Sequence, residues 1–213
     1  MNPNDPQPVP GAPGAGFIEA GVGGMTIRIA APVDPDALTR AGVERREASP
    51  GYWAHLWPSA RELARHLARS ALVGPGVRVL EVGCGLGLCG VVAALRGAEV
   101  TMTDFNPEAV SAARRNADLN GAVVRCERFD WHDAVPGAWV GAVDLVIASD
   151  VLYEAGGTGV EALARLVRRL GCPAMIADPA RPRSSDAESG FRALGLRVWA
   201  TPANTGRIIM VTA

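Results

Sequence analysis

The chain has 213 residues, of which 48% are hydrophobic, so it can bury one sizeable core. Its net charge of −1 gives no electrostatic reason to expect a nucleic-acid or membrane partner. All 21 basic residues are arginines, which excludes a phosphate-loop ATPase, a Schiff-base enzyme and a lysine general base. No apolar run approaches the roughly 20 residues that span a bilayer. No basic patch precedes an apolar stretch at the N-terminus, so we expect a cytoplasmic protein.

The first part of the chain predicts no chemistry. Residues 1–16 are rich in proline and glycine, and we expect a disordered leader there. Residues 17–58 are expected to form an N-terminal extension that packs on the main domain, residues 59–213. The extension should contain a strand at 25–29 and a helix at 35–41. We expect it to cover one edge of the sheet or to wall off the substrate side.

From Ser59 onward, helical and extended patterns alternate. A capping box of Ser59 and Glu62 predicts a helix that continues to Ala71, and Asn106-Pro107-Glu108 predicts another that ends near Leu119. The remaining helices are expected at 87–96, 158–170 (opened by a Thr158–Glu161 capping box) and 185–194. Strands are expected at 77–82, 98–104, 123–129, 143–149, 174–177, 197–201 and 207–212. This order predicts an α/β, Rossmann-like, doubly wound sheet of seven strands, five of them parallel, with a C-terminal antiparallel hairpin.

The glycine-rich segment after the first strand of this sheet indicates a nucleotide-like ligand. Glycines 85, 87 and 90 fit the G-x-G-x-x-G pattern of dinucleotide enzymes, whereas residues 81–87 fit E-x-G-x-G-x-G. A carboxylate at Glu81 would repel a pyrophosphate but suits a cationic amino group or sulfonium. Asp104, at the end of the next strand, can accept hydrogen bonds from a ribose. We therefore favour S-adenosylmethionine over a nicotinamide dinucleotide; a salt bridge from Glu81 to an arginine is the alternative that would weaken this interpretation.

Acidic residues follow each parallel strand of the predicted sheet: Glu81, Asp104, Asp130, Asp150 and Asp178. Because parallel strands end at the same edge, these side chains are expected around one site. Helix capping is the alternative explanation for Asp130 and Asp178. The four cysteines and three histidines show no metal-ligand spacing, so we expect no metal, and we expect the cysteines to be free thiols.

Several segments carry a resemblance to a known family: Tyr52-Trp53-Ala54, Leu56-Trp57-Pro58, the loop at 81–87, Asp150-Val151-Leu152-Tyr153 and Asp178-Pro179-Ala180-Arg181-Pro182. They resemble the class I methyltransferases and, within them, the seven-β-strand protein-lysine methyltransferases. The similarity is greatest to the group that modifies the β-subunit of the electron transfer flavoprotein. The N-P-P-[YFW] tetrad of amide and adenine methyltransferases is absent from positions 149–152.

The resemblance implies S-adenosylmethionine as cofactor, S-adenosylhomocysteine as product, and specific roles for residues. Asp150 orients the lysine ammonium, and Tyr153 helps to align the neutral amine. Trp57 lines the methionine end of the cofactor, unless it is only a core anchor. Asp130 and Trp131 flank the adenine. The full set of expected cofactor-binding residues is Trp57, Glu81, Gly83, Cys84, Gly85, Gly87, Asp104, Phe105, Asp130, Trp131 and Ser149.

The resulting hypothesis is an N-methyltransferase that acts on a protein lysine, with the flavoprotein β-subunit as leading target. We expect a monomer whose partner is a protein substrate, without nucleic acid or membrane. The alternatives are a small-molecule N- or O-methyltransferase and a non-catalytic module that binds the cofactor. Arg181 has three open assignments, namely pairing with Asp150, with Asp178 or with an acidic target. The glycine-rich residues 154–157 are a departure from the family that is expected to affect the substrate entrance.

Overall fold

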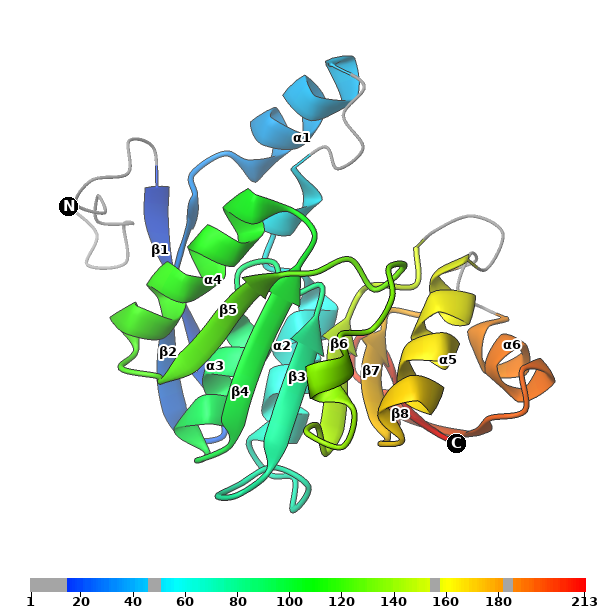
Figure 1. Cartoon of the computed structure of the whole chain (residues 1–213). Helices are drawn as coiled ribbons and strands as arrows, with labels where there is room; N and C mark the ends of the chain where they lie inside the picture. Colours follow the sequence, from blue (N-terminus) through cyan, green and yellow to red (C-terminus); the bar gives the residue numbers. More distant parts are fainter. Residues whose placement is uncertain (1–14, 46–50, 154–157, 182–185) are drawn as a thin grey trace.

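The computed structural model describes residues 15–45, 51–153, 158–181 and 186–213 (Figure 1). A seven-stranded sheet occupies its centre. In spatial order its strands are β5 (Val124–Arg128), β4 (Glu99–Asp104), β3 (Arg78–Val82), β6 (Leu145–Ser149), β7 (Ala174–Asp178), β9 (Gly206–Thr212) and β8 (Arg197–Ala203). β3 to β7 are parallel, and β9 runs antiparallel to both of its neighbours. The predicted seven-stranded sheet with its terminal hairpin is confirmed.

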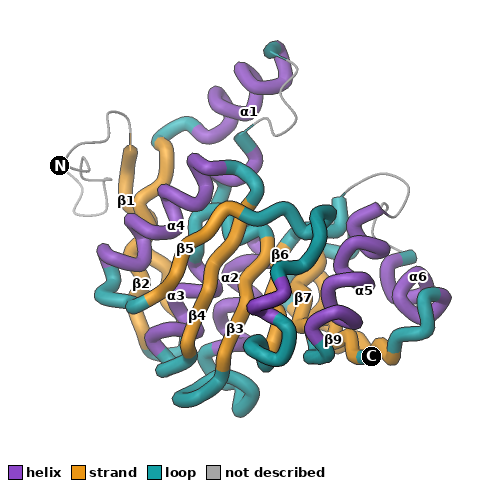
Figure 2. The backbone as a smooth tube through the Cα atoms, in the orientation of Figure 1, coloured by secondary structure: helices purple, strands orange, loops and turns teal. Residues whose placement is uncertain are grey.

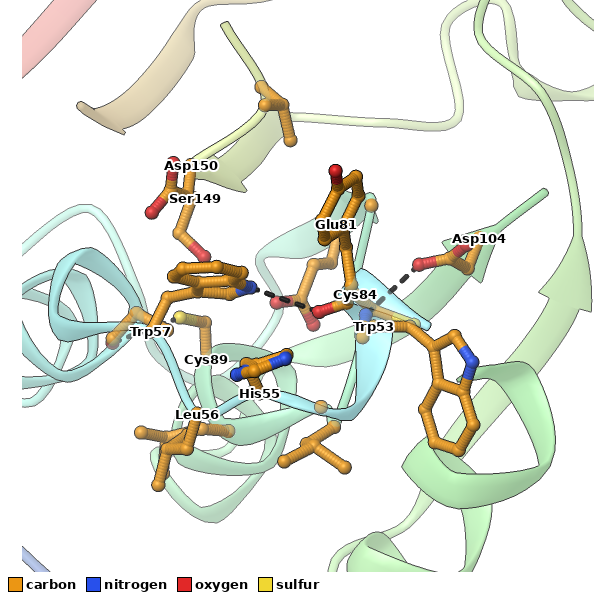
Figure 3. A pocket seen from close by; sticks show the side chains of 18 of the residues that line it. Trp53, His55, Leu56, Trp57, Glu81, Cys84, Cys89, Asp104, Ser149 and Asp150 are labelled. Carbon is orange, nitrogen blue, oxygen red and sulfur yellow. Dashed lines mark hydrogen bonds between the residues drawn. The ribbon is translucent and has the colours of Figure 1, made fainter. Parts of the chain in front are cut away.

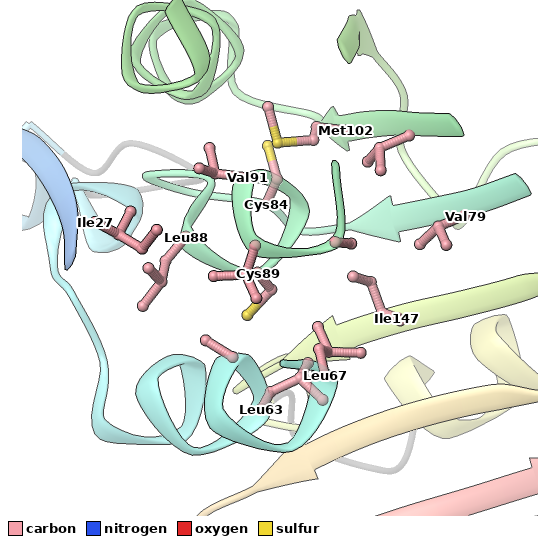
Figure 4. Packing of buried hydrophobic residues seen from close by; sticks show 14 of the residues in the cluster. Ile27, Leu63, Leu67, Val79, Cys84, Leu88, Cys89, Val91, Met102 and Ile147 are labelled. Atoms are coloured by element: carbon pink, nitrogen blue, oxygen red, sulfur yellow. The ribbon is translucent and has the colours of Figure 1, made fainter. Parts of the chain in front are cut away.

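Helices cover both faces of this sheet (Figures 1 and 2). On one face lie α2 (Pro58–Leu67), α3 (Leu88–Leu95) and α4 (Pro107–Leu119), and on the other lie α5 (Thr158–Leu170) and α6 (Ala187–Ala193). Successive side chains of a strand point to opposite faces, so Val79 joins the α2–α3–α4 core and Leu80 joins the α5–α6 core (Figure 4). Burial on both faces explains why the central strands β6 and β7 are almost continuous apolar runs.

Two helix starts test the predicted caps. Asn106 caps α4, and its side chain accepts a hydrogen bond from the Glu108 N–H at 2.8 Å, as predicted. The capping box at Ser59 is wrong: Trp57 is the N-cap of α2, Pro58 is the first helical residue, and the helix ends at Leu67. Proline is preorganised for the first helical position, so the helix begins there. The Ser59 hydroxyl instead donates to Asp150 Oδ2 at 3.0 Å.

A hairpin forms the N-terminal part of the described chain, with strands β1 (Ala15–Val22) and β2 (Met25–Pro32). It is followed by α1 (Pro35–Glu44) and the short 3₁₀ helix η1 (Tyr52–Ala54). β1 was not predicted, and it begins inside the expected leader, whose residues 1–14 lie outside the described part. The hairpin packs mainly on α4, α2 and α3 and not on a sheet edge. The other alternative, that the extension walls off the substrate side, stays a prediction. The division of the chain at residue 59 stays a prediction.

Asn116 of α4 and Asn120, the C-cap of this helix, hold the hairpin. The Asn116 amide accepts from the Ala30 N–H (2.8 Å) and donates to the Ala30 carbonyl (3.2 Å). Asn120 does the same with Arg28, at 2.9 and 2.7 Å. Arg28 and Ala30 are two residues apart in a strand, a rise of about 6.6 Å, and Asn116 and Asn120 are four apart along a helix, a rise of about 6 Å. The two asparagines can therefore reach the two strand residues at the same time. None of the described helices has the length and apolar character to cross a membrane.

Candidate active site

A pocket opens at the carboxyl ends of β3, β4 and β6 (Figure 3). It contains every residue expected around the site except Asp130 and Asp178. Its lining is Tyr52, Trp53, His55, Leu56, Trp57, Ala60, Glu81, Gly83, Cys84, Gly85, Leu86, Gly87, Leu88, Cys89, Asp104, Phe105, Trp131, Ser149, Asp150, Val151 and Tyr153. The Asp130 carboxylate instead accepts hydrogen bonds from the backbone and ring nitrogens of His132, each at 2.9 Å. Its predicted contact with adenine stays a prediction.

The glycine loop forms the base of the pocket, where Gly83 lies against Trp131 and Gly85 against the Trp53 backbone. Glycines 83, 85 and 87 have φ of 64°, 51° and 80°, a region that side chains disfavour. A Cβ at Gly83 would lie 2.9 Å from Val151 Cγ1 and 3.0 Å from the Trp131 ring. The alternating glycines therefore permit a turn that packs directly against the pocket wall.

Glu81 is buried beneath this loop, with 2% of its surface exposed. Its Oε2 accepts a hydrogen bond from the Gly90 N–H at 2.9 Å, and a Cβ at residue 90 would come within 2.5 Å of that oxygen. Burial raises the pKa of Glu81 to about 8, against a smaller lowering by the Gly90 N–H. In the part of the chain that the structure describes, no arginine forms an ion pair with Glu81.

Asp104 and Trp131 give the pocket the polar groups that a nucleoside needs. Asp104 Oδ2 accepts from the Gly85 N–H (3.1 Å) and Oδ1 from the Asn106 N–H (2.9 Å), and burial raises the pKa of this carboxyl. Each carboxylate oxygen keeps a further lone pair for a ribose hydroxyl. The buried indole Nε1 of Trp131 has no hydrogen-bond partner among the described residues. An unpaired buried donor is costly, so this N–H fits a ligand acceptor.

Residues before α2 form a wall of the pocket that the sequence only partly predicted. The Trp57 Nε1 donates to the Tyr52 carbonyl at 3.1 Å, and the His55 ring stacks on Trp57 with centroids 4.9 Å apart. His55 Nε2 also lies 3.0 Å from the Thr39 hydroxyl of α1. The sequence predicted no role for His55 or Trp53. The available signal was that Trp53 belongs to the Tyr52-Trp53-Ala54 segment and that His55 lies between this segment and Leu56-Trp57-Pro58.

Next to this wall lies the predicted catalytic pair, Asp150 and Tyr153. Only 4% of the Asp150 side chain is exposed, and Arg181 donates to both of its carboxylate oxygens, Nη2 at 3.1 Å from Oδ2. Asp178 pairs with Arg207 instead, which settles the ion-pair assignment of Arg181. At the exposed rim, the Tyr153 and Tyr52 rings meet edge to face at 6.1 Å.

The pocket is narrow. Its free volume is about 70 Å³, whereas ligand pockets usually have about 300–1,000 Å³, so a nucleoside needs the rim side chains to move.

Burial holds the pKa values of Cys84 and Cys89 well above their usual range, so both are neutral thiols. All four cysteines are free and buried, as expected. Among the described residues, no group of three or more His, Cys, Asp or Glu side chains is arranged to hold a metal ion.

Comparisons with known proteins identify the family of this chain. A family model described as lysine methyltransferase matches residues 43–191. The electron transfer flavoprotein beta subunit lysine methyltransferase of Danio rerio is 34% identical over 139 residues, which are 63% of this chain and 52% of that protein. Its Xenopus laevis counterpart is 32% identical over 137 residues, 63% of this chain and 54% of that protein. The chain thus spans about half the length of these curated relatives.

A solved structure supports the fold. The S-adenosylmethionine-dependent methyltransferase from Aquifex aeolicus superposes with a TM-score of 0.57 at 16% identity, over 84% of this chain and 97% of that one. At this identity the likeness concerns the arrangement of helices and strands.

Proposed function

Because the chain belongs to the lysine methyltransferase family, we propose that it transfers a methyl group from S-adenosylmethionine to the side-chain nitrogen of a lysine in a protein. One observation carries this proposal. The lining of a single pocket contains the glycine loop with Glu81 and Asp104 and also Asp150 and Tyr153. Figure 3 shows Asp150 across the pocket from Asp104. The first set suits a nucleoside with a cationic tail, and the second suits an amine that enters from the rim.

The residues on the nucleoside side suit binding of this cofactor. Asp104 is placed to accept ribose hydroxyls, and the Trp131 N–H is available to an acceptor of the bound ligand. With a pKa of about 8, Glu81 is mostly protonated at pH 7, and a cationic group bound beside it would favour its ionised form. The sulfonium of S-adenosylmethionine supplies an electrophilic methyl group. Trp57 offers it an aromatic face.

Positioning of the acceptor falls to Asp150 and Tyr153. A lysine arrives as an ammonium ion and must lose a proton before its nitrogen lone pair can attack. We assign to the Asp150 carboxylate the orientation of the cation and to the Tyr153 hydroxyl the alignment of the neutral amine. Most of the rate acceleration then comes from holding the nitrogen in line with the transferred methyl group.

The acceptor protein we propose to test first is the electron transfer flavoprotein β-subunit, because two relatives carry its name. We propose a cytoplasmic monomer that binds no nucleic acid. The four free thiols are compatible with a reducing compartment. The alternative of a small-molecule acceptor is separated from the protein acceptor by the experiment below.

The test is methyl transfer from labelled S-adenosylmethionine to purified flavoprotein β-subunit, and to a cell lysate that is then separated into protein and small molecules. We expect label on protein lysines, located by mass spectrometry of peptides. Label confined to small molecules would reject the protein acceptor. Failure to bind S-adenosylhomocysteine in isothermal titration would reject the whole proposal.

The variant Asp150→Asn tests the catalytic assignment. Asparagine tolerates the positive φ of residue 150 (58°) and keeps an oxygen for Ser59, so the fold should survive. We expect transfer to fall at least about 100-fold, because the acceptor cation loses its counter-charge, while S-adenosylhomocysteine affinity stays within about twofold. The matched control is Asp144→Asn, which also breaks an aspartate–arginine pair but lies outside the pocket. Wild-type turnover in Asp150→Asn would remove the residue from the mechanism.

A further inference from the structure

Arg181 occupies a place that is built to hold a cation. Its guanidinium pairs with both oxygens of Asp150, and its Cζ lies 5.4 Å from the centroid of the Trp57 ring. The Ser59 hydroxyl completes the set by donating to Asp150 Oδ2. A buried carboxylate beside an aromatic face is the combination that binds alkylammonium ions as well as guanidinium.

The backbone on both sides of this ion pair has an uncommon conformation. Among the described residues other than glycine, positive φ occurs at Asp150 (58°) and Ala180 (55°), which directly precedes Arg181. Such conformations cost free energy and persist where surrounding contacts enforce them. Here the Asp150 N–H donates to the Ala177 carbonyl (2.9 Å), and the Ala180 N–H donates to Asp178 Oδ2 (3.1 Å). The structure therefore holds Arg181 and Asp150 toward each other at a conformational cost.

We propose that the Arg181 guanidinium fills the subsite of the acceptor cation in the free enzyme, and that an incoming ammonium must displace it from Asp150 and Trp57. Arg181 then controls binding of the acceptor, because it lowers the apparent affinity for a cation in proportion to the fraction of molecules in which the subsite is open. The side chain is 40% exposed, so the displaced guanidinium can move into water. This inference rests on the proposed function, which places the acceptor beside Asp150.

The test measures binding of n-butylammonium, a minimal lysine side chain, by isothermal titration at pH 8 without cofactor. We expect Arg181→Ala to bind it at least tenfold more tightly than the wild type. Adding Asp150→Asn to Arg181→Ala should abolish the gain. The control Arg78→Ala removes an arginine from the pair with Asp144, outside the pocket, and should leave the affinity at the wild-type value. If Arg181→Ala does not fold, the same titration is done with Arg181→Gln, which keeps the apolar stem of the side chain. This variant should also bind n-butylammonium at least tenfold more tightly than the wild type.

Two outcomes would overturn the inference. One is equal n-butylammonium affinity in the wild type and the Arg181 variant, which would make Arg181 a structural counter-charge. The other is a tenfold loss of S-adenosylhomocysteine affinity in the variant, which would place the guanidinium on the cofactor's carboxylate. Because the titration needs no methyl transfer, it decides about Arg181 even if the proposed lysine acceptor is wrong. With an active acceptor, Arg181→Ala should lower KM several-fold and leave kcat within about twofold.

Discussion

The Glu81 carboxyl group is buried under the glycine loop and accepts one backbone hydrogen bond. Its pKa of about 8 in the folded protein, against an ordinary value of 4.5, means that the folded state holds a proton that the unfolded state has released. The stabilisation that this proton gives is complete below about pH 4.5 and is lost as the pH rises toward 8. An ionised Glu81 therefore lowers the free energy of unfolding, and a cation bound beside it offsets this loss.

We expect the free energy of unfolding of the ligand-free protein to decrease between pH 5 and 8, by up to about 1.4 kcal/mol per pH unit from this one group. Glu81→Gln cannot release a proton and should flatten the profile. Asp104, whose pKa is also raised, contributes with the same sign in both proteins. Urea unfolding at several pH values measures the difference between the two profiles. Parallel profiles would show that Glu81 is ionised in the folded protein.

At the scale of single elements, α4 links the N-terminal hairpin to the cofactor side of the pocket. Asn116 is fully buried and bonds the Ala30 backbone, and its amide also donates to the Leu86 carbonyl in the glycine loop at 2.8 Å. Asn120, one turn later, makes its backbone bonds to Arg28 at an exposed position. Substituting Asn116 and Asn120 separately therefore distinguishes the contact with the glycine loop from the contact with the hairpin alone.

We expect Asn116→Ala to reduce the free energy of unfolding by about 2–4 kcal/mol, because several buried backbone groups lose their partners. It should also weaken S-adenosylhomocysteine binding, since the carbonyl at Leu86 loses its donor. Asn120→Ala should cost about 1 kcal/mol and leave binding unchanged, because water replaces its exposed bonds. Urea unfolding and isothermal titration give the two readouts. Equal losses in both variants would refute the link between α4 and the loop.

For the whole molecule, the structure has a sheet covered by helices on both faces and a hairpin outside one helical layer (Figure 1). The hairpin adds Val22, Ile27 and Ile29 to the core under α2, α3 and α4, each with at most 2% of its surface exposed. The N-terminal region is therefore part of the same cooperative core as the site.

Deletion of residues 1–32 should abolish cooperative unfolding. Burying one such aliphatic side chain contributes about 1.5–3 kcal/mol, and three of them approach the 5–15 kcal/mol that holds a typical domain together. Near-ultraviolet circular dichroism during heating measures the transition. The control is Val43→Ala, which changes an exposed residue of α1 and should shift stability by less than about 0.5 kcal/mol. A deleted protein that melts like the wild type would make the hairpin dispensable.

The sequence by itself determined the elements whose signals are local. The apolar strands, the Asn106 cap, the glycine loop and the acidic residues at strand ends each lie within a few neighbouring residues, and the structure has them where they were predicted. The Ser59 capping box shows the limit of this approach, because Pro58 supplied a competing local signal and a distant aspartate took the hydroxyl.

Only the tertiary structure decided which distant groups meet. Asp150 lies 91 residues from Ser59 and 31 from Arg181, and Ala30 lies 86 residues from Asn116. No local pattern encodes these pairs, because they depend on which loops the parallel sheet brings to one edge and which helix faces the hairpin. Burial then sets the chemistry of the site. It raises the pKa of Glu81, and it shields from water the Trp131 N–H, which has no partner among the residues that the structure describes.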